Sequence, residues 1–370
     1  MMKTGKKVAI VSVSDVRNMT MISIYTDYFE KEGISYELIC TDRYKDGKST
    51  WRNAIIHTIK IPGLNSGKIK NFMGFLRFRG FAIETLKKEK YDYVVVWNEH
   101  TAVILSDFLI KYSPYCVNIR DIVLTNLPFY FRRLSAVVKK SDFSTWCAPK
   151  GKELLPNYDY TIVMNQNKSL VDGARVEKGF IKKDKVIHIG VVGYIRHIDE
   201  SKELMKAFIN DDRFVIQFFG TGAELLQEYA EQIGMKNIEI SGTFPAERTK
   251  EYLDKIDVIN VYIGDGKERI DQSLGAPIRY GYSSLLYKPA IVSPNTYLSE
   301  RTRELNIAYT VKDFKNLPDQ FYEWYSGLDF ETFKKGCDEF NHEYDVHMEQ
   351  FVCICNQKIK TLICGELVNE

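Results

Sequence analysis

Residues 276–292 read APIRYGYSSLLYKPAIV, a short amphipathic segment followed by an apolar run. Pro277 is typical of the first turn of a helix, and the free backbone N–H groups of such a turn can bind an anion. The apolar residues after Lys288 and Pro289 predict the start of a buried parallel strand. The segment therefore predicts an anion-binding helix start inside a fold that alternates strands and helices.

Length and composition indicate a globular chain with two domains. The 370 residues are too many for one ordinary core. The fractions of hydrophobic residues (45%) and charged residues (27%) are those of a globular protein. No apolar run is long enough to cross a bilayer, and the first one, residues 8–13, is too short for a signal peptide. We therefore expect a cytoplasmic protein.

The cysteines indicate neither a disulfide framework nor a metal site. There are seven, at irregular spacings, and this favours reduced thiols. Cys353 and Cys355 lie near His347, but their spacing fits no standard zinc site. We expect no metal ion and no tightly bound cofactor.

Short apolar strands alternate with amphipathic helices in both halves of the chain. Residues 8–12 begin the first alternation and residues 186–192 begin the second. This order predicts an α/β protein with two doubly wound Rossmann-like domains, which we expect to face each other across a cleft. The predicted organisation is a domain over 1–165, a linker over 166–184, a domain over 185–345 and a tail helix over 346–370 that packs back on the first domain.

Small and basic residues follow three strands expected in the second domain. Glycine at a strand end lets a ligand approach the backbone closely, and arginine can bind a phosphate with two hydrogen bonds. Tight strand-to-helix turns and a solvated lysine are the alternative explanation. The residues in question are Gly193, Arg196, Lys202, Gly220, Gly222, Gly242 and Thr243.

These segments, together with residues 276–292, resemble family-4-like glycosyltransferases of the two-domain GT-B fold, of the capsule or exopolysaccharide type. There the loop after the first strand reads G-x-x-x-x-K/R and its basic pair holds the donor diphosphate, which would assign that role to Arg196 and Lys202. Residues 219–224 resemble the family's G-x-G-x-E, and residues 239–244 resemble its F-x-G segment, where the backbone lies against the nucleobase. The resemblance covers most of residues 85–312.

The segment at 276–292 departs from the family pattern at one position. Many members carry E-x7-E, whose second glutamate holds the donor ribose. Leu274 and Tyr282 stand at those two positions here. A tyrosine hydroxyl can form a hydrogen bond to the ribose, but without the charge of a carboxylate. Arg279 matches the basic residue of the family's P-x-K/R variant, which implies contact with phosphate or sugar.

The first domain supplies two further candidate catalytic residues. Residues 91–101 read YDYVVVWNEHT and resemble the family's Y-D, apolar strand and H-D-x-x-T. The resemblance implies that Glu99 and His100 contact the transferred sugar or an acceptor hydroxyl. An ordinary helix N-terminus is the alternative. Arg120 and Asp121 follow the next strand and either brace the cleft or bind the acceptor.

Charge is distributed unevenly along the chain. The net charge of +2 combines +10 over residues 1–180 with −8 over residues 181–370. The basic half contains Lys68–Lys90, a segment that mixes phenylalanines with lysines and arginines. Such a helix suits an anionic membrane surface, although a core helix with charged flanks is the alternative. We find no nucleic-acid-binding motif and expect no nucleic-acid partner.

The sequence is thus interpreted as a glycosyltransferase of the hexosyltransferase type. It would move a sugar from a nucleotide-diphosphate donor to a lipid-linked or saccharide acceptor in cell-surface polysaccharide synthesis. We expect retention at the anomeric carbon, no metal, and a peripheral location on the inner face of the cell membrane. A non-catalytic sugar-nucleotide-binding assembly protein and a sugar-nucleotide 2-epimerase are the alternatives.

Overall fold

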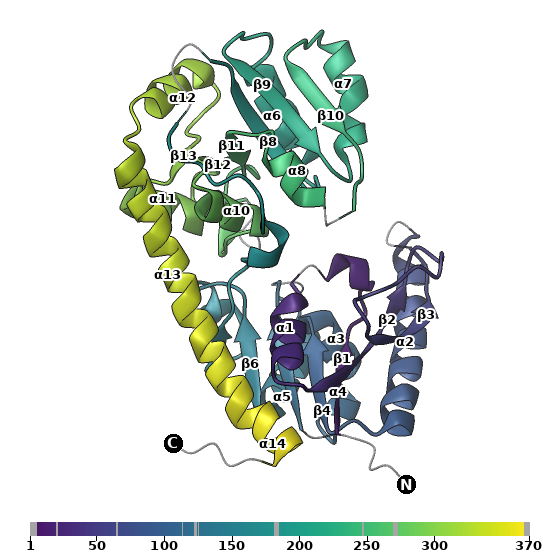
Figure 1. Ribbon diagram of the computed structural model, residues 1–370. Helices are drawn as coiled ribbons and strands as arrows, with labels where there is room; N and C mark the ends of the chain where they lie inside the picture. Colours follow the sequence, from purple (N-terminus) through teal and green to yellow (C-terminus); the bar gives the residue numbers. More distant parts are fainter. Residues whose placement is uncertain are drawn as a thin grey trace. The chain divides into compact units, whose positions relative to one another are not determined.

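The computed structural model describes residues 6–19, 21–63, 66–112, 114–121, 124, 126–180, 185–245, 248–268 and 273–365. The chain divides into two compact units (Figure 1). Unit 1 comprises residues 1–164 and 346–370, and unit 2 comprises residues 165–345.

Unit 1 is built on a seven-stranded sheet whose order is β3-β2-β1-β4-β5-β6-β7. Every pair of neighbouring strands is parallel. The strands are β1 (Lys7–Val11), β2 (Ser35–Asp42), β3 (Ile55–Lys60), β4 (Tyr93–Trp97), β5 (Tyr115–Ile119), β6 (Phe143–Trp146) and β7 (Thr161–Ile162). The central strands β4 and β5 are buried along their whole length, as expected for a parallel sheet covered on both faces.

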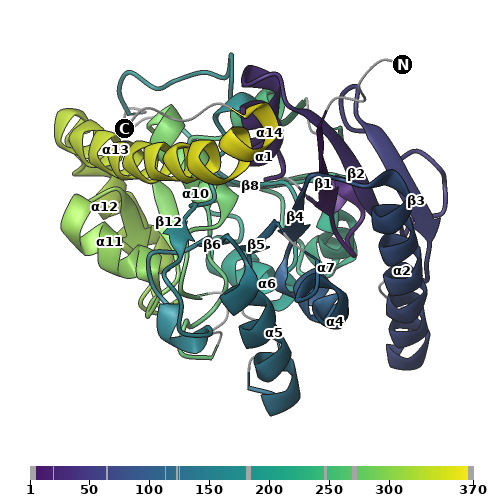
Figure 2. The same cartoon turned by 90° about the horizontal axis from the view of Figure 1, so that it is seen from below.

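Helices cover both faces of this sheet (Figure 2). On one face, α1 packs against the C-terminal part of α13, where the rings of Tyr25 and Phe351 lie 5.0 Å apart and the hydroxyl of Tyr28 donates to the Asn356 side chain. The opposite face is covered by α2, α4 and α5. The unit 1 helices are α1 (Ser23–Lys31), α2 (Lys68–Glu89), α3 (Glu99–Ile104), α4 (Ser106–Leu109) and α5 (Pro128–Lys140), with α13 (Phe330–Cys355) and α14 (Thr361–Cys364) from the end of the chain.

Unit 2 contains a six-stranded parallel sheet of order β10-β9-β8-β11-β12-β13. Its strands are β8 (Ile187–Val192), β9 (Phe214–Phe219), β10 (Ile238–Ser241), β11 (Val258–Asn260), β12 (Ala290–Val292) and β13 (Ala308–Thr310). Its helices are α6 (Ile198–Ala207), α7 (Gln227–Gln232), α8 (Thr249–Leu253), α10 (Ile278–Leu286), α11 (Tyr297–Leu305) and α12 (Leu317–Ser326). The core includes Phe208, Phe214 and Phe321, whose rings contact one another.

Residues 165–180 pack on unit 2 through several side chains. Gln166 donates to Ser284 on α10 and to Asn341 on α13. The side chain of Glu177 lies 3.2 Å from the ammonium of Lys288. The segment expected to be a linker is therefore tied to unit 2 over these residues, while positions 181–184 lie outside the described residues.

The predicted fold class, with two doubly wound parallel sheets, is confirmed. The helix expected to begin at Pro277 is α10, and Pro277 is its N-cap residue. The segment after β4 forms two short helices, α3 and α4, separated at Leu105.

Candidate functional site

Two loops at the carboxyl edge of the unit 2 sheet pack directly on each other. The amide of Gly193 donates to the Phe219 carbonyl at 2.9 Å, and the amide of Ile195 donates to the Thr221 carbonyl at 2.9 Å. A Cβ atom on Gly220 would lie 1.9 Å from the carbonyl oxygen of Gly193. Gly220 also has a φ of +133°, a conformation that other residues rarely adopt. The glycine is therefore required by the packing of the two loops.

The neighbouring turn shows the same requirement. Gly222 has a φ of +94°, and a Cβ atom there would lie 2.5 Å from the carbonyl oxygen of Ile195. The hydroxyls of Thr221 and Thr243 lie 3.0 Å apart and join the loop after β9 to the loop after β10. Both threonines are exposed. The predicted loop residues thus form one continuous edge, as expected where parallel strands end.

Gly242 differs from these glycines. A Cβ atom at this position would meet nothing within 4 Å. Packing within the chain therefore does not explain the glycine. Beyond it, Phe244 stacks on Tyr252 with ring centroids 4.1 Å apart, and this fixes the end of the loop.

The structure brings Arg196 and Arg279 into electrostatic contact. Arg196 is exposed just before α6, and Arg279 is half-buried in the first turn of α10. Burial lowers the pKa of Arg279 to about 10, with a further decrease caused by the positive charge of Arg196. Tyr282, one turn along α10, opposes this decrease. The sequence predicted Arg196 as a phosphate ligand and Arg279 as a contact to phosphate or sugar, and these roles remain predictions.

No carboxylate neutralises this pair within the described part of the chain. Neither arginine has an ion pair or a hydrogen bond there, and the one ring contact of Arg196 is with Tyr194 at 5.0 Å. No side chain caps the N-terminus of α10 either. Two like charges and an uncapped helix start favour a bound anion, because an anion would remove the repulsion and satisfy the free donors.

Tyr282 and Lys202 are less directly associated with this edge. Tyr282 is buried, and burial raises the pKa of its phenol, an effect that Arg279 opposes. Its ring therefore stands beside the arginine pair, at the position where the resemblance implies a ribose contact. Lys202 lies on α6 with its ammonium 5.1 Å from the centre of the Tyr229 ring. No contact in the structure joins Lys202 to the arginines, and its role remains a prediction.

Unit 1 places Glu99 and His100 at the carboxyl end of β4. The side chain of Asn98 accepts a hydrogen bond from the Thr101 amide and so begins α3. The imidazole Nδ1 of His100 lies 2.7 Å from the hydroxyl of Tyr130. Burial lowers the pKa of His100, which favours its neutral form, while the charge of Asp121 opposes the shift. Both predicted residues therefore face a polar cluster.

Glu99 is a buried carboxyl group, with 2% of its surface exposed. Its Oε2 atom has no hydrogen-bond partner among the described residues. Burial, together with the nearby charge of Asp121, raises the pKa of Glu99 to about 8, although backbone N–H groups of the same segment oppose the shift. Glu99 is therefore largely protonated at neutral pH.

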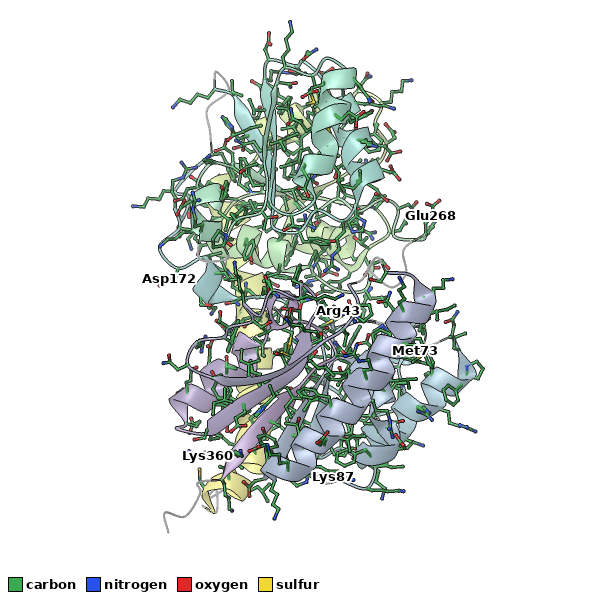
Figure 3. All side chains as sticks on the ribbon, turned by 90° about the vertical axis from the view of Figure 1, so that its right-hand side faces the viewer. Arg43, Met73, Lys87, Asp172, Glu268 and Lys360 are labelled. Atoms are coloured by element: carbon green, nitrogen blue, oxygen red, sulfur yellow. The ribbon has the colours of Figure 1, made fainter. Side chains whose placement is uncertain are left out.

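Sequence reasoning missed Arg43 and Tyr130 as members of this cluster. Arg43 follows β2 (Figure 3), and its charge lowers the pKa of His100. Its own pKa is lowered by burial. The sequence signal that could have identified Arg43 is its position directly after an expected strand, because the carboxyl ends of parallel strands lie at one edge of the sheet. Arg120, in contrast, donates to the Val163 carbonyl at 3.2 Å within unit 1, and its predicted role in bracing the cleft or binding the acceptor remains a prediction.

Across the described ranges, no three His, Cys, Asp or Glu side chains gather closely enough to hold a metal ion. The seven cysteines are all free thiols.

Comparison with solved structures gives consistent fold relatives. Sucrose-phosphate synthase from Thermosynechococcus elongatus has a TM-score of 0.73 and 10% identity, with 98% of this chain and 100% of that chain covered. A glycosyltransferase from Rickettsia africae has a TM-score of 0.60 and 12% identity over 96% and 99% of the two chains. A UDP-N-acetylglucosamine 2-epimerase has a TM-score of 0.55 and 12% identity over 90% and 91%.

No protein-family model and no curated protein sequence matches this chain. At 10–12% identity the structural likeness establishes the fold alone. That fold is the GT-B arrangement of two Rossmann-like units, which agrees with the expectation from sequence.

Proposed function

We propose that this chain is a glycosyltransferase that uses a nucleotide-diphosphate sugar. The observation that carries the proposal is the pair of Arg196 and Arg279, which has no counter-ion in the described residues and lies beside an uncapped helix start. A diphosphate is an anion of suitable charge for this place. Its binding would offset the cost of burying Arg279 next to a like charge.

The proposed chemistry assigns the arginines to the leaving group. Transfer of the sugar leaves negative charge on the nucleoside diphosphate, and two fixed guanidinium groups stabilise that charge without reorganising. We propose a hexosyl donor, retention at the anomeric carbon and no requirement for a metal ion, following the family-4-like resemblance. Tyr282 is proposed to contact the ribose in place of the glutamate of other members.

The proposed acceptor is a lipid-linked or saccharide group in cell-surface polysaccharide synthesis, at the inner face of the cell membrane. Glu99 and His100 are proposed to contact the acceptor or the transferred sugar. The neutral His100 can accept a proton or a hydrogen bond, and the protonated Glu99 can donate one.

A sugar-nucleotide 2-epimerase is the second candidate, because one such enzyme shares the fold over most of both chains. Both enzymes would need the diphosphate-binding arginines, so binding alone does not separate them.

The separating experiment follows the sugar nucleotide with time, with and without a lipid extract as acceptor. A transferase releases nucleoside diphosphate only when the acceptor is present, and Arg196→Ala reduces that release. Conversion of the sugar nucleotide to an isomer without an acceptor would establish the epimerase instead. Binding without any turnover would support the non-catalytic alternative. Arg303→Ala, an exposed arginine elsewhere in unit 2, is the matched control.

A further inference from the structure

Unit 1 exposes large apolar side chains on two of its helical segments. On α2 the exposed fractions are 81% for Ile69, 60% for Phe72, 53% for Met73 and 47% for Leu76. These positions follow the spacing i, i+3, i+4, i+7 and form one stripe on the helix. The stripe ends at Leu76, since the exposed residues of the second half of α2 are mainly charged or glycine.

The segment that leads into α5 continues the pattern. Leu124 is 46% exposed, Leu127 is 47% exposed and Phe129 is 59% exposed. The guanidinium of Arg133 lies 4.6 Å from the centre of the Phe129 ring. We call the combined set the apolar edge, and it consists of Ile69, Phe72, Met73, Leu76, Leu124, Leu127 and Phe129.

The apolar edge lies at one end of the unit 1 sheet. Helix α2 follows β3 and α5 follows β5, so both helices begin where parallel strands end. Both cover the same face of the sheet (Figure 2). Figure 3 shows Met73 near the same end of unit 1 as Arg43, whereas Lys87 lies at the opposite end of α2. Glu99 and His100 follow β4 and therefore also lie at this end.

The charged residues of the two segments that carry the apolar edge are all basic. Residues 66–77 contain Lys68, Lys70 and Arg77 and no acidic residue, and residues 124–133 contain Arg132 and Arg133 and no acidic residue. Both lysines are exposed. Basic side chains around exposed apolar groups fit a surface that combines anionic head groups with a hydrocarbon interior.

Other occupants fit this combination less well. A second copy docked through the same face would bring like charges together, which is unfavourable in a symmetric interface. Lysine is also depleted from the cores of protein interfaces. Nucleic acid would use the cations but would gain little from exposed Ile69, Met73 and Leu76, because bases stack on aromatic rings.

We propose that the apolar edge inserts into the surface of an anionic bilayer, with the N-terminal half of α2 and the start of α5 as two contacts. The proposed membrane contact is limited to one end of α2. It adds to the proposed function because the candidate acceptor residues lie at that same end. It rests on the proposed function only for the nature of the acceptor. None of the helices in the described ranges is long and apolar enough to cross a bilayer.

The test compares two pairs of lysines on the same helix. Binding of the purified chain to vesicles of phosphatidylcholine, with and without phosphatidylglycerol, is measured by sedimentation. Lys68→Gln/Lys70→Gln and Lys87→Gln/Lys88→Gln remove the same charge from opposite ends of α2. The first pair is expected to weaken binding to the anionic vesicles by about tenfold or more, and the second by much less. Equal losses would overturn the assignment to the N-terminal half.

A second comparison tests the apolar contribution. Ile69→Ser is paired with Ile55→Ser, which alters another exposed isoleucine (59%) at the first residue of β3, the other end of the sheet. Phe129→Ser is a third variant, which alters the contact at the start of α5. Ile69→Ser and Phe129→Ser should weaken binding to the anionic vesicles, whereas Ile55→Ser should not. Binding of the wild type should also persist at higher salt concentration than binding of the two weakened variants. Failure of the wild type to bind anionic vesicles would overturn the proposal. A concentration-dependent dimer that Ile69→Ser abolishes would identify a second copy as the occupant and would also overturn it.

The proposed function is monitored separately in every variant. Thermal stabilisation by nucleoside diphosphates reports on unit 2, and none of these substitutions lies in unit 2. Stabilisation without vesicle binding would reject the membrane surface alone, and vesicle binding without stabilisation would reject the donor site alone.

Discussion

Arg279 and Lys288 are two cations of unit 2, the first half-buried and the second completely buried, and their surroundings differ. Arg279 faces Arg196 and has no acidic partner among the described residues. Lys288 is completely buried, donates to the carbonyls of Leu253 and Ile256, and lies 3.2 Å from Glu177. The first arrangement is unfavourable without a ligand, whereas the second is satisfied within the chain. We therefore assign ligand binding to Arg279 and a structural role to Lys288.

Lys288 and Arg279 are expected to respond differently to substitution. Loss of Lys288 should lower the free energy of unfolding, whereas loss of Arg279 should not. Lys288→Met removes the two hydrogen bonds that the buried ammonium donates to the carbonyls of Leu253 and Ile256, and its ion pair with Glu177, which keeps its ion pair with Arg175. The substitution is expected to lower the free energy of unfolding by about 3 kcal/mol. Lys255→Met, which breaks an exposed ion pair with Glu239, should cost less than about 1 kcal/mol. Chemical denaturation measures both, and equal losses would contradict the structural role of Lys288.

Arg279→Met removes a half-buried charge next to Arg196. The melting temperature without ligand is expected to stay the same or rise, because the repulsion between the two arginines disappears. Stabilisation by a nucleoside diphosphate should be lost in the same variant. Differential scanning calorimetry with and without nucleotide tests both statements. A clear drop in stability of the free protein would indicate a structural role for Arg279.

The raised pKa of Glu99 predicts that the stability of the folded protein depends on pH. Because its pKa rises from 4.5 to about 8 in the folded state, its contribution to stability is fully present below the ordinary pKa and is lost as the pH rises through about 8. Glu99→Gln imitates the protonated form at every pH. At pH 9 the variant should be more stable than wild type by about 2 kcal/mol, or roughly 4–8 °C in melting temperature.

The two proteins should differ little at pH 4, where wild-type Glu99 is protonated. Glu153→Gln, at an exposed position, should not alter the pH dependence. A stability profile for Glu99→Gln that parallels wild type between pH 4 and pH 9 would show that folding does not shift the pKa of Glu99.

At the scale of elements, the loops after β8 and β9 pack directly on each other and would form the rigid part of the proposed donor site. Gly220→Ala would place a methyl group 1.9 Å from the Gly193 carbonyl oxygen, so the loops must separate. We expect a loss of about 2 kcal/mol or more in stability together with loss of nucleotide binding.

Gly242→Ala is the informative companion, since its added methyl group meets nothing within 4 Å. It should leave stability almost unchanged. If the nucleobase lies against this backbone, as the resemblance implies, Gly242→Ala weakens nucleotide binding without destabilising the fold. Unchanged affinity would exclude Gly242 from the base contact.

At the scale of the whole molecule, the sequence predicted the alternation of strands and helices in both units. Local signals were sufficient there: apolar runs such as β4, and turn residues such as Gly33 and Pro277. The sequence also predicted two domains and a tail helix over 346–370; in the structure this tail belongs to a longer helix, α13, that begins in unit 2 and ends in unit 1.

Interactions between residues far apart in the chain were not predictable in the same way. The raised pKa of Glu99 depends on Asp121, and the effect of Arg43 on His100 requires β2 and β4 to end at the same edge. The pairing of Glu177 with Lys288 likewise joins segments more than a hundred residues apart. A single sequence contains no local pattern for such contacts. The polar cluster of unit 1 could therefore be predicted only in part from the sequence.

The most direct test of the central claim is a calorimetric titration of nucleoside diphosphates into wild type, Arg196→Ala, Arg279→Ala and the double variant, with Arg303→Ala as control. One nucleoside diphosphate is expected to bind wild type and Arg303→Ala with equal affinity. Each single variant should lose roughly tenfold to a hundredfold in affinity. The loss in the double variant should be smaller than the product of the two single losses, because both arginines are proposed to hold the same diphosphate. Affinities that do not change when both arginines are removed would contradict the proposed donor site.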